Sequence, residues 1–408
     1  GDHRDLHLSI RRQRQMCIRD SILNEWTRWK DYTVSTSYFR TDLEYFAVRN
    51  TTGVIDYTPM VKQKITGPDA AEFVNRFFTR DMNKIAVGRV GYVVWCDEAG
   101  QVLDDGTVFH VRENEYWLLC VERQLDNLGN SAVGFDVKIE EITDEVACLG
   151  VQGPTSCSIL KAIGFDAIEH LKPFDIKHYD FQGQEVMVSR TGFSGDLGYE
   201  VCMPNDVALN LWDELFDKGE IYGIKPFGLD ALDLVRIEAG LLVPGQDFMV
   251  AEEAIRPGST RSPFELGLSW LVDLSKPVFN GREALLEEKK RGSRYTFVKL
   301  NINGNKPAEG AYLYNQSGKK IGNVTSAMFS PSAKANIAFA TLHDPWKKGK
   351  DKIIAEIYYQ KDLEWNKVME EATIVTKPFF DPDRKLSLIH ISEPTRRYAI
   401  SYAVFCLK

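Results

Sequence analysis

The feature that most constrains the fold is a short sequence pattern that occurs twice, 86 residues apart (Gly67 to Gly153). In each copy an apolar run ends in Gly-Pro and continues into a helix-like run, DAAEFVNRFF after Pro68 and TSCSILKAIG after Pro154. Proline suits the first turn of a helix because no backbone donor is needed there, so each block predicts a strand, a turn and a helix. Two such blocks predict two α+β modules of similar construction.

Other sequence patterns predict further helices and strands of these modules and a third structural part. A helix is predicted to end at Gly219, and another to run from Leu229 to Ala239. From Tyr295 to Phe380 short β-rich runs alternate with Gly, Asn, Lys and Asp, which is typical of a small β-barrel. The fold class is therefore α+β, with two modules and a C-terminal β-barrel. Between the blocks, alternation predicts strands at Tyr92–Cys96, Val102–Val111, Tyr116–Val121 and Phe135–Ile139.

Composition excludes several classes of function. A formal net charge of −8 and a pI near 5.6 provide no basic surface for nucleic acid, and no apolar run is long enough to span a membrane. Apart from His3 and His7 near the N-terminus, the histidines form no HxxxH or HxH group, so no metal site is expected. The seven cysteines contain no CxxC pair, and this odd, dispersed set predicts reduced thiols in a cytoplasmic protein.

Two adjacent acids, Asp104 and Asp105, stand within a strand-like stretch. Neighbouring residues of a strand point to opposite faces, so one carboxylate is expected to enter a cleft and the other to stay in solvent. Taken alone, Asp105-Gly106 is typical of a turn, and the pattern leaves that alternative open.

A glycine-rich stretch, SRTGFSGDLGYE, ends at Glu200 and has Gly192, Gly195 and Gly198 at every third position. Such spacing allows sharp turns and a close approach of the backbone to a flat ligand, although an ordinary hairpin explains it equally well. The Glu200 carboxylate can accept two parallel N–H bonds in the fork geometry used for guanidinium. A ring system with an exocyclic amine beside a ring N–H would suit it.

These blocks together resemble the glycine cleavage T-protein (aminomethyltransferase) family. In that family a tyrosine precedes a hairpin that ends approximately in Gly-Gly-(Ile/Val)-(Ile/Leu)-Asp-Asp, and here Tyr92 precedes Gly100-Gln101-Val102-Leu103-Asp104-Asp105. The agreement covers nearly all of residues 40–380. Its other blocks are AVRNTTGVIDYTPM, ITGPDAAEFVNRFFTRD, LGVQGPTS, SRTGFSGDLGYE, RIEAGLLVPGQDF, SPFELGLSW, FNGREAL, VTSAMFSPS and VTKPFF.

The resemblance implies a tetrahydrofolate-dependent one-carbon (aminomethyl or methyl) transferase with its modules around a central folate cleft. It implies that Asp105 is the catalytic residue and that Glu200 holds the pterin ring. Met60, Tyr92 and Phe193 match family positions that line the folate, together with Asp105. The implied partner is a small-molecule one-carbon donor or a lipoyl carrier protein.

The predicted domains follow from the same resemblance. Residues 22–290 form the folate-binding, aminomethyltransferase-like catalytic region, and residues 291–385 form the barrel domain. Residues 1–21 and 386–408 match nothing in the family and look like translated adapter sequence, so both are predicted to be non-native tails.

Several departures from the family concern the expected mouth of the cleft. Pro59 replaces a histidine, Leu232 an arginine, and Pro244 an aromatic residue. The folate-binding core is thus expected to be retained while the donor side is altered. The main alternative is a tetrahydrofolate-dependent demethylase that takes a methyl group from a small sulfonium, N-methyl or O-methyl compound.

Two further classes are disfavoured by specific features. A non-enzymatic folate-binding protein of iron-sulfur assembly would carry a cysteine in the stretch from Ala239 to Asp247, and none is present. A flavin-dependent dehydrogenase would need a dinucleotide-binding GxGxxG unit, which the sequence lacks.

Overall fold

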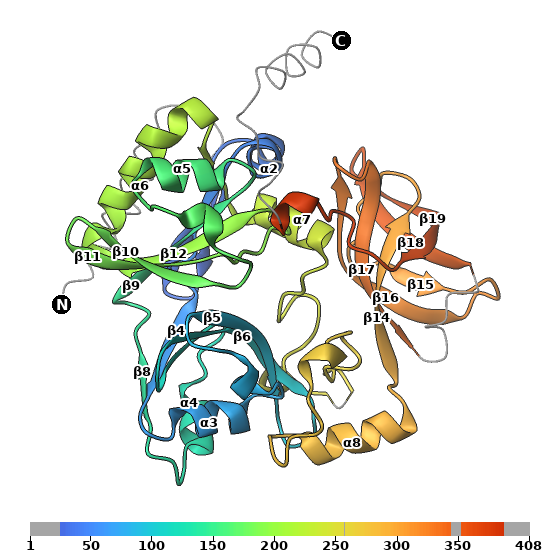
Figure 1. The fold of residues 1–408 in the computed structure, drawn as a ribbon. Coiled ribbons are helices and arrows are strands. Elements are labelled where there is room, and N and C mark those ends of the chain that lie inside the picture. Colours follow the sequence, from blue (N-terminus) through green and yellow to red (C-terminus); the bar gives the residue numbers. More distant parts are fainter. Residues whose placement is uncertain (1–24, 257, 344–351, 387–408) are drawn as a thin grey trace. The chain divides into compact units, whose positions relative to one another are not determined.

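The computed structural model of the protein describes residues 25–256, 258–343 and 352–386. Within these limits the chain forms two compact units (Figure 1). The first holds residues 25–59, 144–235 and 381–386, and the second holds residues 60–143 and 236–380. Apart from Leu386, the two segments predicted to be non-native tails lie outside the described residues.

The first unit is built on a six-stranded sheet in the order β10-β11-β12-β9-β3-β13. Helices α5 and α6 cover one face, where Val151, Tyr199 and Leu211 belong to a continuous apolar core (Figure 1). Because side chains alternate along β12, Glu200 lies on the opposite face from Tyr199. The bounds in this unit are β1 Glu25–Trp29, β2 Tyr32–Ser37, α2 Thr41–Asn50, β3 Gly53–Asp56, β9 Val146–Gln152, α5 Ser156–Ala162, β10 Ile176–Phe181, β11 Gln184–Ser189, β12 Gly198–Pro204, α6 Asn205–Gly219 and β13 Lys225–Pro226; α7, Leu229–Ala239, begins in this unit and ends in the second.

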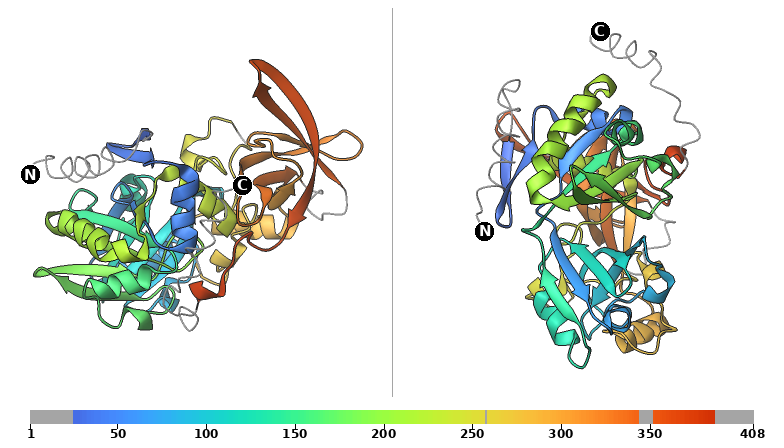
Figure 2. Two further views of the ribbon diagram at one scale, coloured as in Figure 1. Left: turned by 90° about the horizontal axis from the view of Figure 1, so that it is seen from above. Right: turned by 60° about the vertical axis from the view of Figure 1, so that its left-hand side comes forward.

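The second unit contains a five-stranded sheet in the order β5-β6-β7-β4-β8, packed around Phe73, Phe77 and Trp95. It also contains a closed barrel in the order β14-β17-β16-β15-β18-β19, which Figure 2 shows from two further directions in orange to red. The predicted β-barrel is therefore confirmed. The bounds are β4 Val61–Thr66, α3 Ala70–Phe77, β5 Arg89–Cys96, β6 Val102–Arg112, β7 Glu115–Cys120, α4 Leu125–Ser131, β8 Lys138–Glu141, α8 Arg282–Arg291, β14 Tyr295–Ile302, β15 Tyr312–Tyr314, β16 Lys320–Ser330, β17 Ala335–His343, β18 Ile353–Lys361 and β19 Glu364–Val375.

The repeated block corresponds to a repeated structure. β4 leads through Gly67 into α3, and β9 leads through Gly153 into α5. Both glycines have strongly positive φ angles, +134° and +129°, and a side chain at either position would collide with backbone atoms. Only glycine allows these two strand-to-helix turns, so the two predicted α+β modules are confirmed. Each helix begins two residues after its proline rather than at it.

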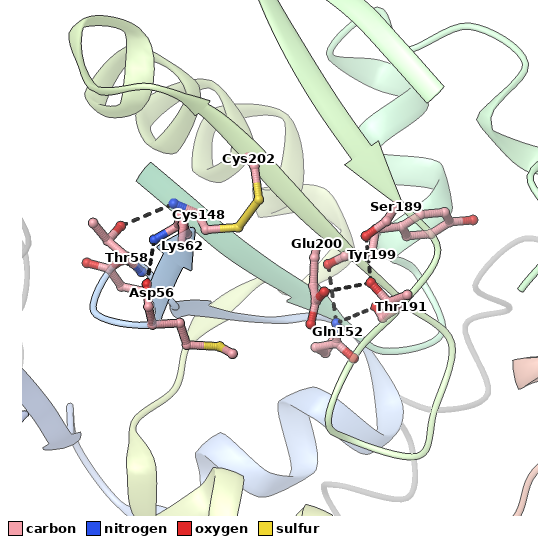
Figure 3. Close-up of a disulfide and its surroundings, with 11 residues drawn as sticks. Asp56, Thr58, Lys62, Cys148, Gln152, Ser189, Thr191, Tyr199, Glu200 and Cys202 are labelled. Carbon is pink, nitrogen blue, oxygen red and sulfur yellow. Dashed lines mark hydrogen bonds between the residues drawn. A yellow bond between two sulfur atoms is a disulfide. The ribbon is translucent and has the colours of Figure 1, made fainter. Parts of the chain in front are cut away.

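A disulfide joins Cys148 on β9 to Cys202 on β12 (Figure 3), so the prediction that all cysteines are reduced thiols was wrong. The two residues stand directly opposite each other in the antiparallel pair, with 4.2 Å between their Cα atoms. Their separation of 54 residues gives no sequence signal, because only the pairing of the strands brings them together. Buried free thiols are found at Cys96, Cys120 and Cys157, and Cys17 and Cys406 lie outside the described residues.

Among the described residues, no helix has the length and apolar character needed to cross a membrane.

Candidate functional site

Asp105 lies inside a strand of the second unit. It is the fourth residue of β6 and pairs with Val94 of β5, while the hairpin turn itself spans residues 97–101. The alternative that Asp105-Gly106 is a turn is therefore wrong. Tyr92, two residues before Val94 on the same face, donates a short hydrogen bond from its hydroxyl to Oδ2 of Asp105.

Burial controls the electrostatics of this pair. Only 7% of Asp105 is exposed, and burial raises the pKa of its carboxyl group to about 6, because the charged form loses hydration. The Tyr92 hydrogen bond lowers this pKa and the negative charge of Asp247 raises it. Burial, followed by the charge of Asp105, raises the pKa of the Tyr92 hydroxyl well above its ordinary value. Tyr92 is thus a fixed donor, and Asp105 is a carboxyl group with a pKa of about 6.

Asp104 was expected in solvent, but it is completely buried. Its Oδ1 accepts the Asp105 N–H at 2.8 Å, and its Oδ2 accepts the Glu122 N–H at 3.1 Å. Burial and the neighbouring Asp105 charge raise the pKa of Asp104 well above its ordinary value. Asp104 does point away from Asp105 as predicted, yet that face of β6 packs against the chain that follows β7. Its hydrogen bond to Glu122 ties β6 to the segment that follows β7.

A buried ionic group near Asp105 was not identified from the sequence. The Asp247 carboxylate pairs with the guanidinium group of Arg236 and accepts hydroxyl hydrogen bonds from Thr325 at 3.0 Å and Ser326 at 2.6 Å. Both charged side chains are at most 1% exposed. Their presence in one sequence block, RIEAGLLVPGQDF, was the available signal, but the pattern did not show that the two side chains meet.

Glu200 forms the centre of a second polar group, on the face of the first unit's sheet opposite that of Tyr199 (Figure 3). The Thr191 hydroxyl donates to its Oε2 at 2.6 Å, and Ser189 lies 2.5 Å from the Thr191 hydroxyl. Burial raises the pKa of Glu200, whereas the Thr191 hydrogen bond lowers it. Among the described residues, the structure shows no hydrogen bond to Oε1, so this oxygen retains the capacity to accept a bond from a ligand.

The stretch before Glu200 folds around one amide side chain. Residues 191–197, the glycine-rich loop, surround Gln152, whose Nε2 donates to the carbonyl groups of Thr191 and Tyr199. A Cβ atom on Gly192 or Gly198 would collide with the Gln152 side chain. This is a specific reason for glycine at two of the three positions. The loop also carries Phe193, which is half-buried.

Comparison with known proteins identifies the family. The model of the GCVT N-terminal domain matches residues 21–276, and that of the glycine cleavage T-protein C-terminal barrel domain matches residues 296–381. The chain belongs to the glycine cleavage T-protein family. Its class of activity is accordingly that of a T-protein-like one-carbon transferase, an enzyme.

Individual T-protein relatives match over most of their length. The chain is 33% identical to the aminomethyltransferase of Caldanaerobacter subterraneus, over 84% of this chain and 88% of that protein. It is 32% identical to the aminomethyltransferase of Bacillus subtilis, over 83% and 90% of the two chains. The crystal structure of the glycine cleavage system aminomethyltransferase T from Bartonella henselae shares the fold, with a TM-score of 0.78, 23% identity and coverage of 90% and 96%.

The predicted T-protein site residues fall into two groups in the structure. Tyr92 and Asp105 contact each other in the second unit, and Glu200 and Phe193 belong to the first. Met60 lies between β3 and β4, where its carbonyl group accepts a hydrogen bond from Lys62. That these groups line one folate cleft stays a prediction. No cluster of three or more His, Cys, Asp or Glu side chains suited to a metal occurs within the described ranges.

Proposed function

We propose that this protein is a tetrahydrofolate-dependent transferase that moves a one-carbon unit from an aminomethyl donor to tetrahydrofolate, with Asp105 as the catalytic residue and Glu200 as the pterin-binding residue. The observation that carries the proposal is the buried Asp105 carboxyl group, held by Tyr92 and titrating near pH 6. A carboxyl group in this state can be ionised at neutral pH and remain poorly hydrated, which suits it to stabilise positive charge.

Asp105 acts on the charge that develops during transfer. As the donor carbon is passed on, positive charge appears on the reacting amine and carbon, and a fixed carboxylate beside them lowers the barrier. Tyr92 holds this carboxylate in one orientation through its hydroxyl group. Alignment of two bound reactants can contribute roughly 7 to 11 kcal/mol beyond free encounter. Tetrahydrofolate supplies the nucleophilic nitrogen that receives the carbon.

The polar group around Glu200 fits a pterin ring. Its Oε2 is already oriented by Thr191, and its Oε1 keeps acceptor capacity. The carboxylate can therefore accept the amine and the adjacent ring N–H of a pterin side by side. Phe193 of the glycine-rich loop is the aromatic residue that we assign to the same ring. Met60 is the further residue that we assign to this site, together with Tyr92.

The identity of the one-carbon donor separates this proposal from a second candidate function. An aminomethyl donor, free or carried on a lipoyl protein, would give methylenetetrahydrofolate and ammonia, because the carbon leaves both its amine and its carrying group, a thiol in a lipoyl carrier, as it bonds to two folate nitrogens. A demethylase would give 5-methyltetrahydrofolate and the demethylated donor. The replacements at Pro59, Leu232 and Pro244 favour testing both donor classes.

The test is product analysis with purified protein and tetrahydrofolate. Aminomethylated lipoyl carrier, free methylated amines and sulfonium compounds are supplied separately, and folate products and ammonia are quantified by mass spectrometry and an ammonia assay. We expect methylenetetrahydrofolate with equimolar ammonia from the aminomethyl donor. Exclusive formation of 5-methyltetrahydrofolate would replace the proposal by the demethylase, and no tetrahydrofolate binding at all would refute both.

A further inference from the structure

The last described residues of the chain return to the unit that contains Glu200. Residues 236–380 belong to the second unit, but residues 381–386 belong to the first. This segment, the C-terminal strap, contains a single turn of 3-10 helix at Asp383–Lys385. It contacts the glycine-rich loop, Arg190 just before that loop, and Arg49 of α2.

Arg384 of the strap binds the loop through a bidentate ion pair with Asp196. Its Nε and Nη2 atoms each lie 2.7 Å from one carboxylate oxygen of Asp196, and Nη2 also donates to the Arg49 carbonyl group at 2.9 Å. The Asp196 side chain is completely buried. A planar guanidinium group on a carboxylate fixes direction as well as distance, so this contact sets the orientation of residue 196.

A second arginine completes the arrangement from inside the unit. The Arg49 side chain is only 3% exposed, lies 3.8 Å from the same Asp196 carboxylate, and donates to the Ser194 carbonyl group at 2.8 Å. Asp196 therefore stands between two guanidinium groups, one from α2 and one from the strap. Removal of Arg384 would leave Arg49 as the only cation near the carboxylate within the described residues.

The strap also meets the beginning of the loop. Arg190, the residue just before the loop, donates from Nη2 to the Lys385 carbonyl group at 3.0 Å and from Nη1 to the Leu171 carbonyl group at 2.7 Å. The strap thus contacts residues at both ends of the loop. Between these ends lie Thr191, which orients Glu200, and Phe193.

We propose that Arg384 is a positioning residue for folate: through Asp196 it holds the glycine-rich loop in the shape that receives the pterin ring, without touching the ring itself. The inference rests on the proposed function. It assigns a role in substrate affinity to a side chain 184 positions beyond Glu200 in sequence.

The test compares Arg384→Ala and Arg384→Lys with Asp383→Asn, a neighbouring exposed strap residue, as the matched control. We expect Arg384→Ala to raise the KM and Kd for tetrahydrofolate about tenfold, as for loss of one charge-assisted contact, with kcat within about twofold. Arg384→Lys keeps the positive charge but cannot form the bidentate contact. Its KM and Kd for tetrahydrofolate should therefore lie between those of the alanine variant and wild type. Millimolar guanidinium chloride should partly restore affinity in the alanine variant.

Hydrogen exchange gives a readout that needs no folate. Amides of residues 191–197 should exchange faster in Arg384→Ala than in wild type, while amides of the barrel strands stay unchanged. Wild-type KM and unchanged loop exchange in Arg384→Ala would overturn the inference, and if this variant does not fold, the same criteria apply to Arg384→Lys. Wild-type protein that binds no tetrahydrofolate would refute the proposed function instead, and loop exchange would then decide alone whether the strap holds the loop.

Discussion

Among single residues, the contact between Tyr92 and Asp105 has the most direct chemical consequence. Burial favours the protonated form of the Asp105 carboxyl group, while the Tyr92 hydroxyl stabilises the ionised form. The two effects leave a pKa of about 6. Since the proposed role needs the carboxylate, activity should be lost as the pH falls through this value and should be retained above it.

Replacing Tyr92 by Phe should shift this profile. The variant removes a hydrogen bond that favours the ionised form, so the pKa of Asp105 should rise by about one unit, given about 1.5 kcal/mol for a hydrogen bond to a charged group. The acidic limb of the kcat profile should therefore move to higher pH. The measurement is kcat at saturating tetrahydrofolate between pH 5 and pH 9, and an acidic limb that stays in place would disprove the proposed role of the hydroxyl.

The sequence identified some of these residues and missed others for a physical reason. Asp105 and Glu200 were predicted as site residues because family blocks and their chemistry coincide at those positions, and both stay predictions. The burial of Asp104 was missed because alternation along β6 predicts its direction but not what packs against it. Arg384 gave no signal, because its partner Asp196 is 188 residues away and only the folded chain brings them together.

At the level of elements, the glycine-rich loop is shaped from within by Gln152 of β9. Its amide donates to backbone carbonyl groups on both sides of the loop, and its Oε1 accepts a hydrogen bond from the Ser194 hydroxyl at 2.7 Å. Gly192 and Gly198 leave the space that this side chain occupies. Loop shape, and hence the position of Phe193, therefore depends on the absence of two Cβ atoms.

A Gly198→Ala variant tests this dependence. The added methyl group would collide with Gln152, so we expect a loss of about 1 to 3 kcal/mol in the free energy of unfolding, as for overpacking, and weaker tetrahydrofolate binding. Gly129→Ala in α4 is the matched control, because a Cβ atom there meets nothing within 4 Å. Thermal melts and folate titrations measure both effects. Equal stability and affinity for the two variants would show that the space around Gln152 is not critical.

Most elements were predictable from sequence because local rules determine them. The two glycine turns, the helix Leu229–Ala239 and the barrel strands follow from φ preference, apolar spacing and alternation. The strand predicted at Phe135–Ile139 is instead β8, Lys138–Glu141, because Phe135 packs on Phe73 of α3 as part of the preceding turn. The Cys148–Cys202 disulfide depends on the register of β9 and β12, which no local pattern encodes.

For the whole molecule, two groups of residues are assigned to one proposed reaction. We propose that Asp105, held by Tyr92, supplies the charge that assists carbon transfer, and that Glu200 and the glycine-rich loop form the pterin site. The first group is assigned to the chemical step and the second to folate binding. Steady-state kinetics can therefore distinguish them, through kcat for the first and the KM for tetrahydrofolate for the second.

The most direct measurement is therefore a comparison of kcat and the KM for tetrahydrofolate in Asp105→Asn and Glu200→Gln against wild type. We predict that Asp105→Asn lowers kcat about 10²- to 10³-fold with little change in KM, since it removes stabilisation specific to the transition state. Glu200→Gln should raise KM about tenfold or more and largely retain kcat, since one pterin acceptor becomes a donor. Near-normal kcat in Asp105→Asn, or an unchanged KM in Glu200→Gln, would contradict the account.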